Sequence, residues 1–117
     1  MDQSVEMVKI AYRAIDDKKG RNITVIDISG ITTIADYFII ADGDSARQVQ
    51  AISDNLEEAL GRAGYFCSDK EGYSAAKWIL LDYKDVVVHI FSKDDRQFYD
   101  LERIWRDGRF VSKEELI

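Results

Sequence analysis

Two apolar stretches in the second half of the chain, residues 77–83 and 86–91, dominate its hydrophobic pattern. Because side chains alternate along a strand, Trp78, Leu80 and Asp82 are expected on one face of the first stretch. Both stretches are apolar at odd and at even positions, a pattern typical of strands covered on both faces. We therefore predict a β-hairpin that is covered by the protein's own helices or, on one side, by another molecule.

The pattern elsewhere predicts three helices and three more strands. Apolar positions three and four residues apart indicate amphipathic helices, and short β-branched or aromatic runs indicate strands. The second helix has a clear start, since Ser45 and Gln48 form a capping box. Helices are expected over residues 2–17, 45–64 and 94–105, and strands over 23–28, 36–41 and 65–67, with the first two strands pairing antiparallel.

This order of elements predicts an α/β fold with a mixed five-stranded sheet flanked by helices. A single domain is expected over residues 1–107, because neither proline nor a Gly/Ser-rich stretch marks a linker. The segment 108–117 is expected to be a C-terminal tail with a loosely docked helical turn. The polar segment 68–72 is expected to be a turn.

Charge and cysteine content narrow the classes of function. The chain has 22 acidic and 16 basic residues and a net charge of −6, so its surface repels phosphate backbones. Direct nucleic-acid binding is therefore disfavoured as the main activity, although an acidic protein can still dock on a basic protein of an RNA particle. The single cysteine, Cys67, allows no internal disulfide and fits a reducing cytoplasm. No apolar run approaches the roughly 18 residues of a membrane span.

The sequence offers little for catalysis, metals or cofactors. The one histidine, His89, stands among valines in a predicted strand, and no serine has a G-x-S-x-G elbow. We interpret His89 as a hydrogen-bonded sheet histidine and Cys67 as a half-buried thiol. One histidine and one distant cysteine do not make a metal site, so no metal and no cofactor are expected.

One arrangement is reminiscent of a nucleotidyltransferase. Gly43 and Ser45 lie between a strand and a helix, and Asp69 and Glu71 follow the next strand. Such enzymes hold phosphate at a helix start and two metals on a carboxylate pair. Here Asp44 would repel a triphosphate, and the carboxylate pair falls in a predicted turn. Transferase activity therefore stays an alternative to a binding protein without catalysis.

The most specific motifs are ADYF at 35–38, WILLD at 78–82, VVVHIF at 86–91 and FYDLE at 98–102. Together they closely resemble the Iojap-related family, the bacterial ribosomal silencing factors. The resemblance runs from the first helix to Trp105, and no family signal is found after Gly108. It implies a nucleotidyltransferase-like fold that lacks the catalytic residues, and hence a protein that is not an enzyme.

The resemblance also implies a partner and a function. Members of the family dock on protein fourteen of the large ribosomal subunit and block joining of the small subunit, which represses translation. An assembly factor of the large subunit that uses the same docking site remains an alternative. In the family, the strand that matches residues 77–80 contributes its tryptophan to the contact. The resemblance implies Lys77, Trp78 and Leu80 as partner-binding residues. To these we add Asp82, Asp69 and Glu71, because their charge would complement a basic ribosomal protein.

Physical considerations agree with Trp78 as the anchor of this site. Interface energy concentrates in aromatic anchors, and acidic neighbours would complement a basic ribosomal protein. The alternative is that Trp78 belongs to the core beneath the C-terminal helix. If its face is uncovered, we also expect a weak homodimer that hides the same face.

Overall fold

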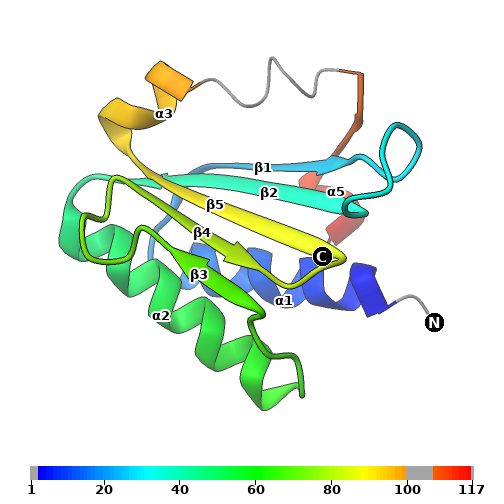
Figure 1. Cartoon of the computed structure of the whole chain (residues 1–117), viewed down its shortest axis with the longest axis horizontal. Coiled ribbons are helices and arrows are strands. Elements are labelled where there is room, and N and C mark those ends of the chain that lie inside the picture. Colours follow the sequence, from blue (N-terminus) through cyan, green and yellow to red (C-terminus); the bar gives the residue numbers. More distant parts are fainter. Residues whose placement is uncertain (1–2, 100–106, 117) are drawn as a thin grey trace.

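Within residues 3–99 and 107–116, the part of the chain that the computed structural model describes, six strands form one mixed sheet (Figure 1). The strands are β1 (Arg21–Asp27), β2 (Tyr37–Gly43), β3 (Asp69–Glu71), β4 (Trp78–Asp82), β5 (Val86–Ser92) and β6 (Arg109–Val111), in the spatial order β3-β4-β5-β2-β1-β6. The helices are α1 (Gln3–Asp17), α2 (Ala46–Arg62), α3 (Lys93–Tyr99) and α5 (Lys113–Leu116). The α/β class and the mixed sheet are thus as predicted.

The centre of the sheet is the parallel pair of β2 and β5, in which Tyr37 lies opposite Val86. The connection between them contains α2, which crosses one face of the sheet (Figure 1). β1 pairs antiparallel with β2, as predicted, and β4 pairs antiparallel with β5, with Trp78 opposite Phe91. The predicted hairpin therefore forms, and β5 lies in the interior of the sheet.

The strand count differs from the prediction at both edges of the sheet. Residues 65–67, predicted as a strand, precede the third strand, and β3 forms instead within the expected turn 68–72. At the other edge β6 pairs with β1, placing Val111 opposite Val25 in the expected tail. Both edge strands are three residues long and lack an apolar run. They form because each pairs with the free backbone edge of a neighbouring strand.

The two faces of the sheet carry separate clusters of buried side chains. Helices α1 and α2 pack on one face, which we call the helix face, against residues such as Ile39 and Ile90. The opposite face, here the second face, carries Phe38, Ile40 and Phe91, all buried. α3 packs on this side, over β5 and β2 (Figure 1). β5 is thus covered on both faces, as predicted, whereas Trp78, Leu80 and Asp82 of β4 stay half-buried.

The start of α2 follows the predicted capping box and extends it. The Ser45 hydroxyl accepts from the backbone N–H of Gln48 at 3.1 Å. The Gln48 side-chain oxygen accepts from the backbone N–H of Asp44 at 2.6 Å, and its amide donates to the carbonyls of Lys18 and Lys19 at the end of α1. One side chain therefore both caps α2 and ties it to α1.

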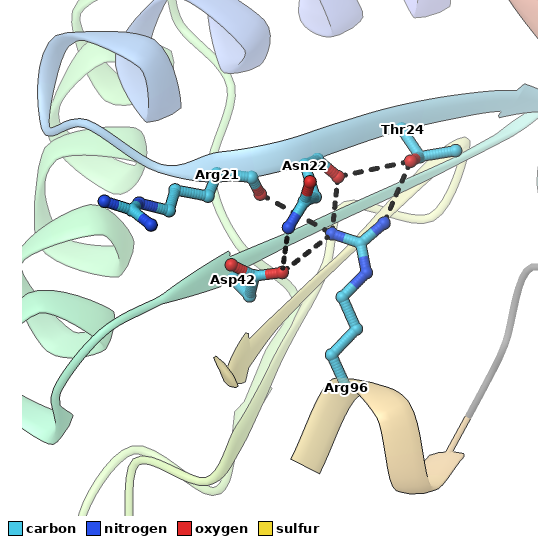
Figure 2. Close-up of polar contacts among 5 residues, drawn as sticks. All are labelled: Arg21, Asn22, Thr24, Asp42 and Arg96. Atoms are coloured by element: carbon cyan, nitrogen blue, oxygen red, sulfur yellow. Dashed lines mark hydrogen bonds and ion pairs between the residues drawn. The ribbon is translucent and has the colours of Figure 1, made fainter. Parts of the chain in front are cut away.

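A buried arginine joins α3 to the sheet, at a position in a charged helix where such a side chain is ordinarily exposed. Arg96 and Asp42 are 9% and 4% exposed, and the guanidinium lies 3.3 Å from the Asp42 carboxylate. The guanidinium also donates to the carbonyls of Arg21 and Asn22 and to the Thr24 hydroxyl (Figure 2). The pairing of β1 with β2 is irregular between Arg21 and Thr24, and Asn22 has a positive φ of 51°. This irregularity leaves carbonyls of β1 free to accept from Arg96.

α3 confirms the start of the predicted helix 94–105 within one residue, and residues 100–105 of that prediction lie outside the described part of the chain. No helix in the described part is both long and apolar enough to cross a membrane.

Replacing the buried arginine should destabilise the protein strongly. In the Arg96→Met variant the Asp42 carboxylate stays buried without its cation, so we expect a loss of about 3 kcal/mol in the free energy of unfolding. Arg62→Met is the matched control, because Arg62 forms an exposed pair with Glu58 and should lose less than about 0.5 kcal/mol. Urea denaturation measures both, and equal losses would contradict the assigned role of Arg96.

Candidate functional site

The structure brings five of the six predicted partner-binding residues onto one side of the sheet. Trp78, Leu80 and Asp82 alternate along β4 on the second face, and all three are half-buried. In the register of β3 with β4, Asp69 lies opposite Asp82 and Glu71 opposite Leu80. Side chains directly opposite each other share a face, so the two exposed carboxylates of β3 join the group. We call these five residues the β3–β4 face.

The two lysines nearby do not belong to this face. Lys70, between the two carboxylates of β3, points to the helix face, where its ammonium lies 2.8 Å from Glu57 of α2. Lys77 is exposed and precedes β4 by one residue, so alternation places it on the side opposite Trp78. Because side chains alternate along a strand, Asp69 and Glu71 lie on the side opposite Lys70, facing away from α2.

The Trp78 indole rests on aromatic side chains of the second face. Its Nε1–H donates to Nδ1 of His89 at 3.0 Å, and its ring stacks on Phe91 with 5.1 Å between centroids. His89 in turn meets the edge of Phe38 at 4.9 Å. The indole is therefore half-buried and held in place, neither fully exposed nor wholly part of the core.

The loop before β4 is folded tightly against the backbone of Trp78. Gly72 has a positive φ of 81°, and a Cβ there would come within 2.1 Å of the Trp78 carbonyl oxygen, so only glycine fits. The Tyr73 hydroxyl donates to Asp54 of α2 at 3.0 Å, and the Gln50 amide donates to the Tyr73 carbonyl at 2.9 Å. The sequence signal for this loop is a glycine followed by tyrosine, which sequence analysis did not assign to the site.

The carboxylates of the β3–β4 face lie close to one another. Asp69 and Asp82 are direct cross-strand neighbours, and like charges in that position destabilise a sheet. Asp82 also accepts from the backbone N–H of Lys84 at 2.7 Å, which holds its side chain at the turn after β4. A cation from another molecule would relieve this repulsion.

His89 makes the predicted hydrogen bond through only one of its two ring nitrogens, Nδ1. It is 4% exposed, and its Nε2 has no hydrogen-bond partner among the described residues. Burial lowers the pKa of His89 from 6.5 to about 4, so the ring is neutral at physiological pH. The prediction of a half-buried Cys67 is confirmed: its thiol donates to the Asp69 carbonyl at 3.0 Å, and burial raises its pKa.

The features reminiscent of a nucleotidyltransferase are far apart in the sheet. Gly43 ends β2 and packs against Val49, and Ser45 caps α2. Asp69 and Glu71 lie in β3, not in a turn as predicted, and strands β4 and β5 separate them from β2. Within the described residues, no three or more His, Cys, Asp or Glu side chains gather in a group that could hold a metal ion.

The chain is similar to known proteins over almost its whole length. A family model described as ribosomal silencing factor during starvation matches residues 1–116, a range that includes β6 and α5, where sequence analysis found no family signal. The ribosomal silencing factor of Halalkalibacterium halodurans is 42% identical over 112 residues, 96% of each chain. A crystal structure from Chromobacterium violaceum has a TM-score of 0.86 and 37% identity, over 96% of this chain and 92% of that one. The chloroplastic Iojap protein of Arabidopsis thaliana is 32% identical, over 85% of this chain and 40% of its own length.

The lowered pKa of His89 should make stability depend on pH in a defined window. Above pH 6.5 the ring is neutral in both states; as pH falls toward 4, only the unfolded chain takes up the proton. This residue should therefore remove up to about 3 kcal/mol of stability between pH 6.5 and 4. Urea denaturation across this range compares the protein with its His89→Asn variant, which should lack this component. Parallel pH profiles would contradict the assignment.

Proposed function

The chain belongs to the family described as ribosomal silencing factor during starvation, and from this premise we propose that it docks on protein fourteen of the large ribosomal subunit and blocks joining of the small subunit. Translation is repressed in the cytoplasm by occupancy alone, so the proposal needs no catalysis and no cofactor. The proposal rests on the β3–β4 face, where a half-buried tryptophan shares one side of the sheet with three carboxylates.

Trp78 supports the proposal as an anchor. Half-buried aromatic side chains contribute disproportionately to protein interfaces, because they remove a large apolar area from water. Leu80 lies two residues along the same face of β4, also half-buried, and extends the apolar area. β3 is the edge strand and β4 is its neighbour, so this area lies at the margin of the sheet, where a partner as large as a ribosomal subunit could approach it.

The carboxylates support a basic partner. Glu71 lies opposite Leu80, and Asp69 lies opposite Asp82 at the end of β4 away from Trp78; the repulsion between these last two falls when a lysine or arginine comes between them. Charge complementarity of this kind raises the rate of association and selects the partner more than it adds affinity. A net charge of −6 would also keep the protein off bare ribosomal RNA and favour a protein surface.

The same face supports a weak homodimer of the free protein. An apolar area around Trp78 and Leu80 is most simply covered at high concentration by a two-fold contact with a second copy. Dimer and ribosome complex then compete for one surface, and the monomer is the active species.

Removal of the anchor should weaken docking. We expect Trp78→Ala to stay folded and to lose about 2 kcal/mol or more of binding free energy for the large subunit, measured by co-sedimentation with purified subunits. Phe66→Ala is the matched control, because Phe66 is the most exposed aromatic in the described chain (77%) and lies near Gly61 of α2, and its binding should be unchanged. Intact binding of Trp78→Ala together with a large loss of stability would make Trp78 a core residue and refute the site.

Trp78→Ala should also shift the free protein toward monomer in sedimentation equilibrium, because it removes the centre of the shared contact. Phe66→Ala should dimerise as the unmodified protein does. The shared-face proposal fails if dimers persist unchanged in Trp78→Ala, or if an intact dimer binds the large subunit.

A further inference from the structure

His89 lies on the same face of the sheet as the proposed docking residues, in the strand next to theirs. It lies opposite Leu80 in the pairing of β4 with β5 and next to Ile40 in the pairing of β5 with β2. It therefore shares the second face with Trp78, and its Nδ1 accepts the indole N–H at 3.0 Å. A buried side chain of the sheet thus holds the polar atom of the residue that we assign as anchor.

The protonation state of His89 follows from this bond. Nδ1 accepts a hydrogen bond and carries no proton, so in the neutral ring the proton is on Nε2. Nε2 is buried and has no hydrogen-bond partner among the described residues. A buried donor without a partner destabilises the fold, and a leucine of similar length would avoid that loss. The histidine is thus poorly explained by packing alone.

We propose that His89 is the positioning residue of the β3–β4 face, holding the Trp78 indole against Phe91 in the orientation that the partner meets. This inference rests on the proposed function and adds a specific role within it. A tryptophan that is already fixed loses less conformational freedom on binding than a mobile one, and one immobilised side chain changes affinity by about tenfold.

Two nearly isosteric substitutions separate the acceptor from the ring. Asparagine places its amide oxygen near the position of Nδ1 and can accept the indole N–H, whereas leucine has the same branched shape and no acceptor. We expect His89→Asn to bind the large subunit within about twofold of the unmodified protein and His89→Leu to bind about tenfold more weakly. In urea, His89→Leu should be at least as stable as His89→Asn. Equal binding by the two variants would overturn the proposal.

A double-mutant cycle ties the effect to the tryptophan. In a Trp78→Ala background, His89→Leu should cause no further loss of binding, because the side chain that it positions is gone. An equal loss with and without Trp78 would overturn the positioning role. If Trp78→Ala itself leaves binding intact, the proposed docking site fails; if Trp78→Ala weakens binding and His89→Leu does not, only the present inference fails.

A direct measurement needs no substitution of His89 or Trp78. In ¹⁵N-labelled protein with Trp105→Phe, Trp78 is the single tryptophan, and an N–H···N bond gives a through-bond coupling between the two nitrogens. We expect that coupling between Trp78 Nε1 and His89 Nδ1, with His89 as the tautomer protonated at Nε2. Absence of the coupling, or a proton on Nδ1, would overturn the proposal.

Discussion

The parallel pair of β2 and β5 is apolar on both faces, and the rest of the fold depends on covering each of these faces. On the helix face α1 and α2 pack over Ile39 and Ile90, which is the ordinary solution for a parallel pair. On the second face, the described residues of α3 lie over β5 and β2. Helices in proteins depend on tertiary contacts for most of their stability. The Arg96 guanidinium supplies them by filling the irregularity in β1 and pairing with Asp42.

The other end of the second face is covered differently. Toward the β3 edge of the sheet, the side chains on the second face change from half-buried in β4 to exposed in β3. His89 is the last fully buried residue in this row, Leu80 is half-buried, and Glu71 is exposed. An interface placed on such a gradient gains an apolar anchor at one side and charge at the other. The proposed docking surface would thus need no large bare apolar patch on the free chain.

The proposed docking site would use for binding a scaffold that is reminiscent of an enzyme. Gly43 packs against α2 and Ser45 caps that helix. The carboxylates of Asp69 and Glu71 are separated from this turn by strands β4 and β5. Carboxylates that would hold metal ions in a transferase are here surface charges next to a tryptophan. The proposed steric block would require only that this surface be rigid, and the Gly72 loop and the His89 bond would both contribute to that rigidity.

The sequence determined the elements whose information is local. Periodicity and capping specify α1, α2 and the β4–β5 hairpin, and the motifs are sufficient for the family, because each depends on residues close together in the chain. Alternation along β4 is also sufficient to place Trp78, Leu80 and Asp82 on one face. Asp69 and Glu71 were predicted for their charge, but their place on the same face depends on the register of β3 with β4.

Only the tertiary structure decided the remaining features, since each arises from partners distant in sequence. β3 and β6 have no hydrophobic pattern of their own and form because β4 and β1 offer unpaired backbone. Arg96 has the sequence pattern of a solvated charge, and only the fold surrounds it with acceptors from β1 and β2. The bond from Trp78 to His89 spans eleven positions and depends on the register of two strands. The pairing and burial of a residue depend on which distant segments the fold places next to it. A local sequence pattern does not specify those segments.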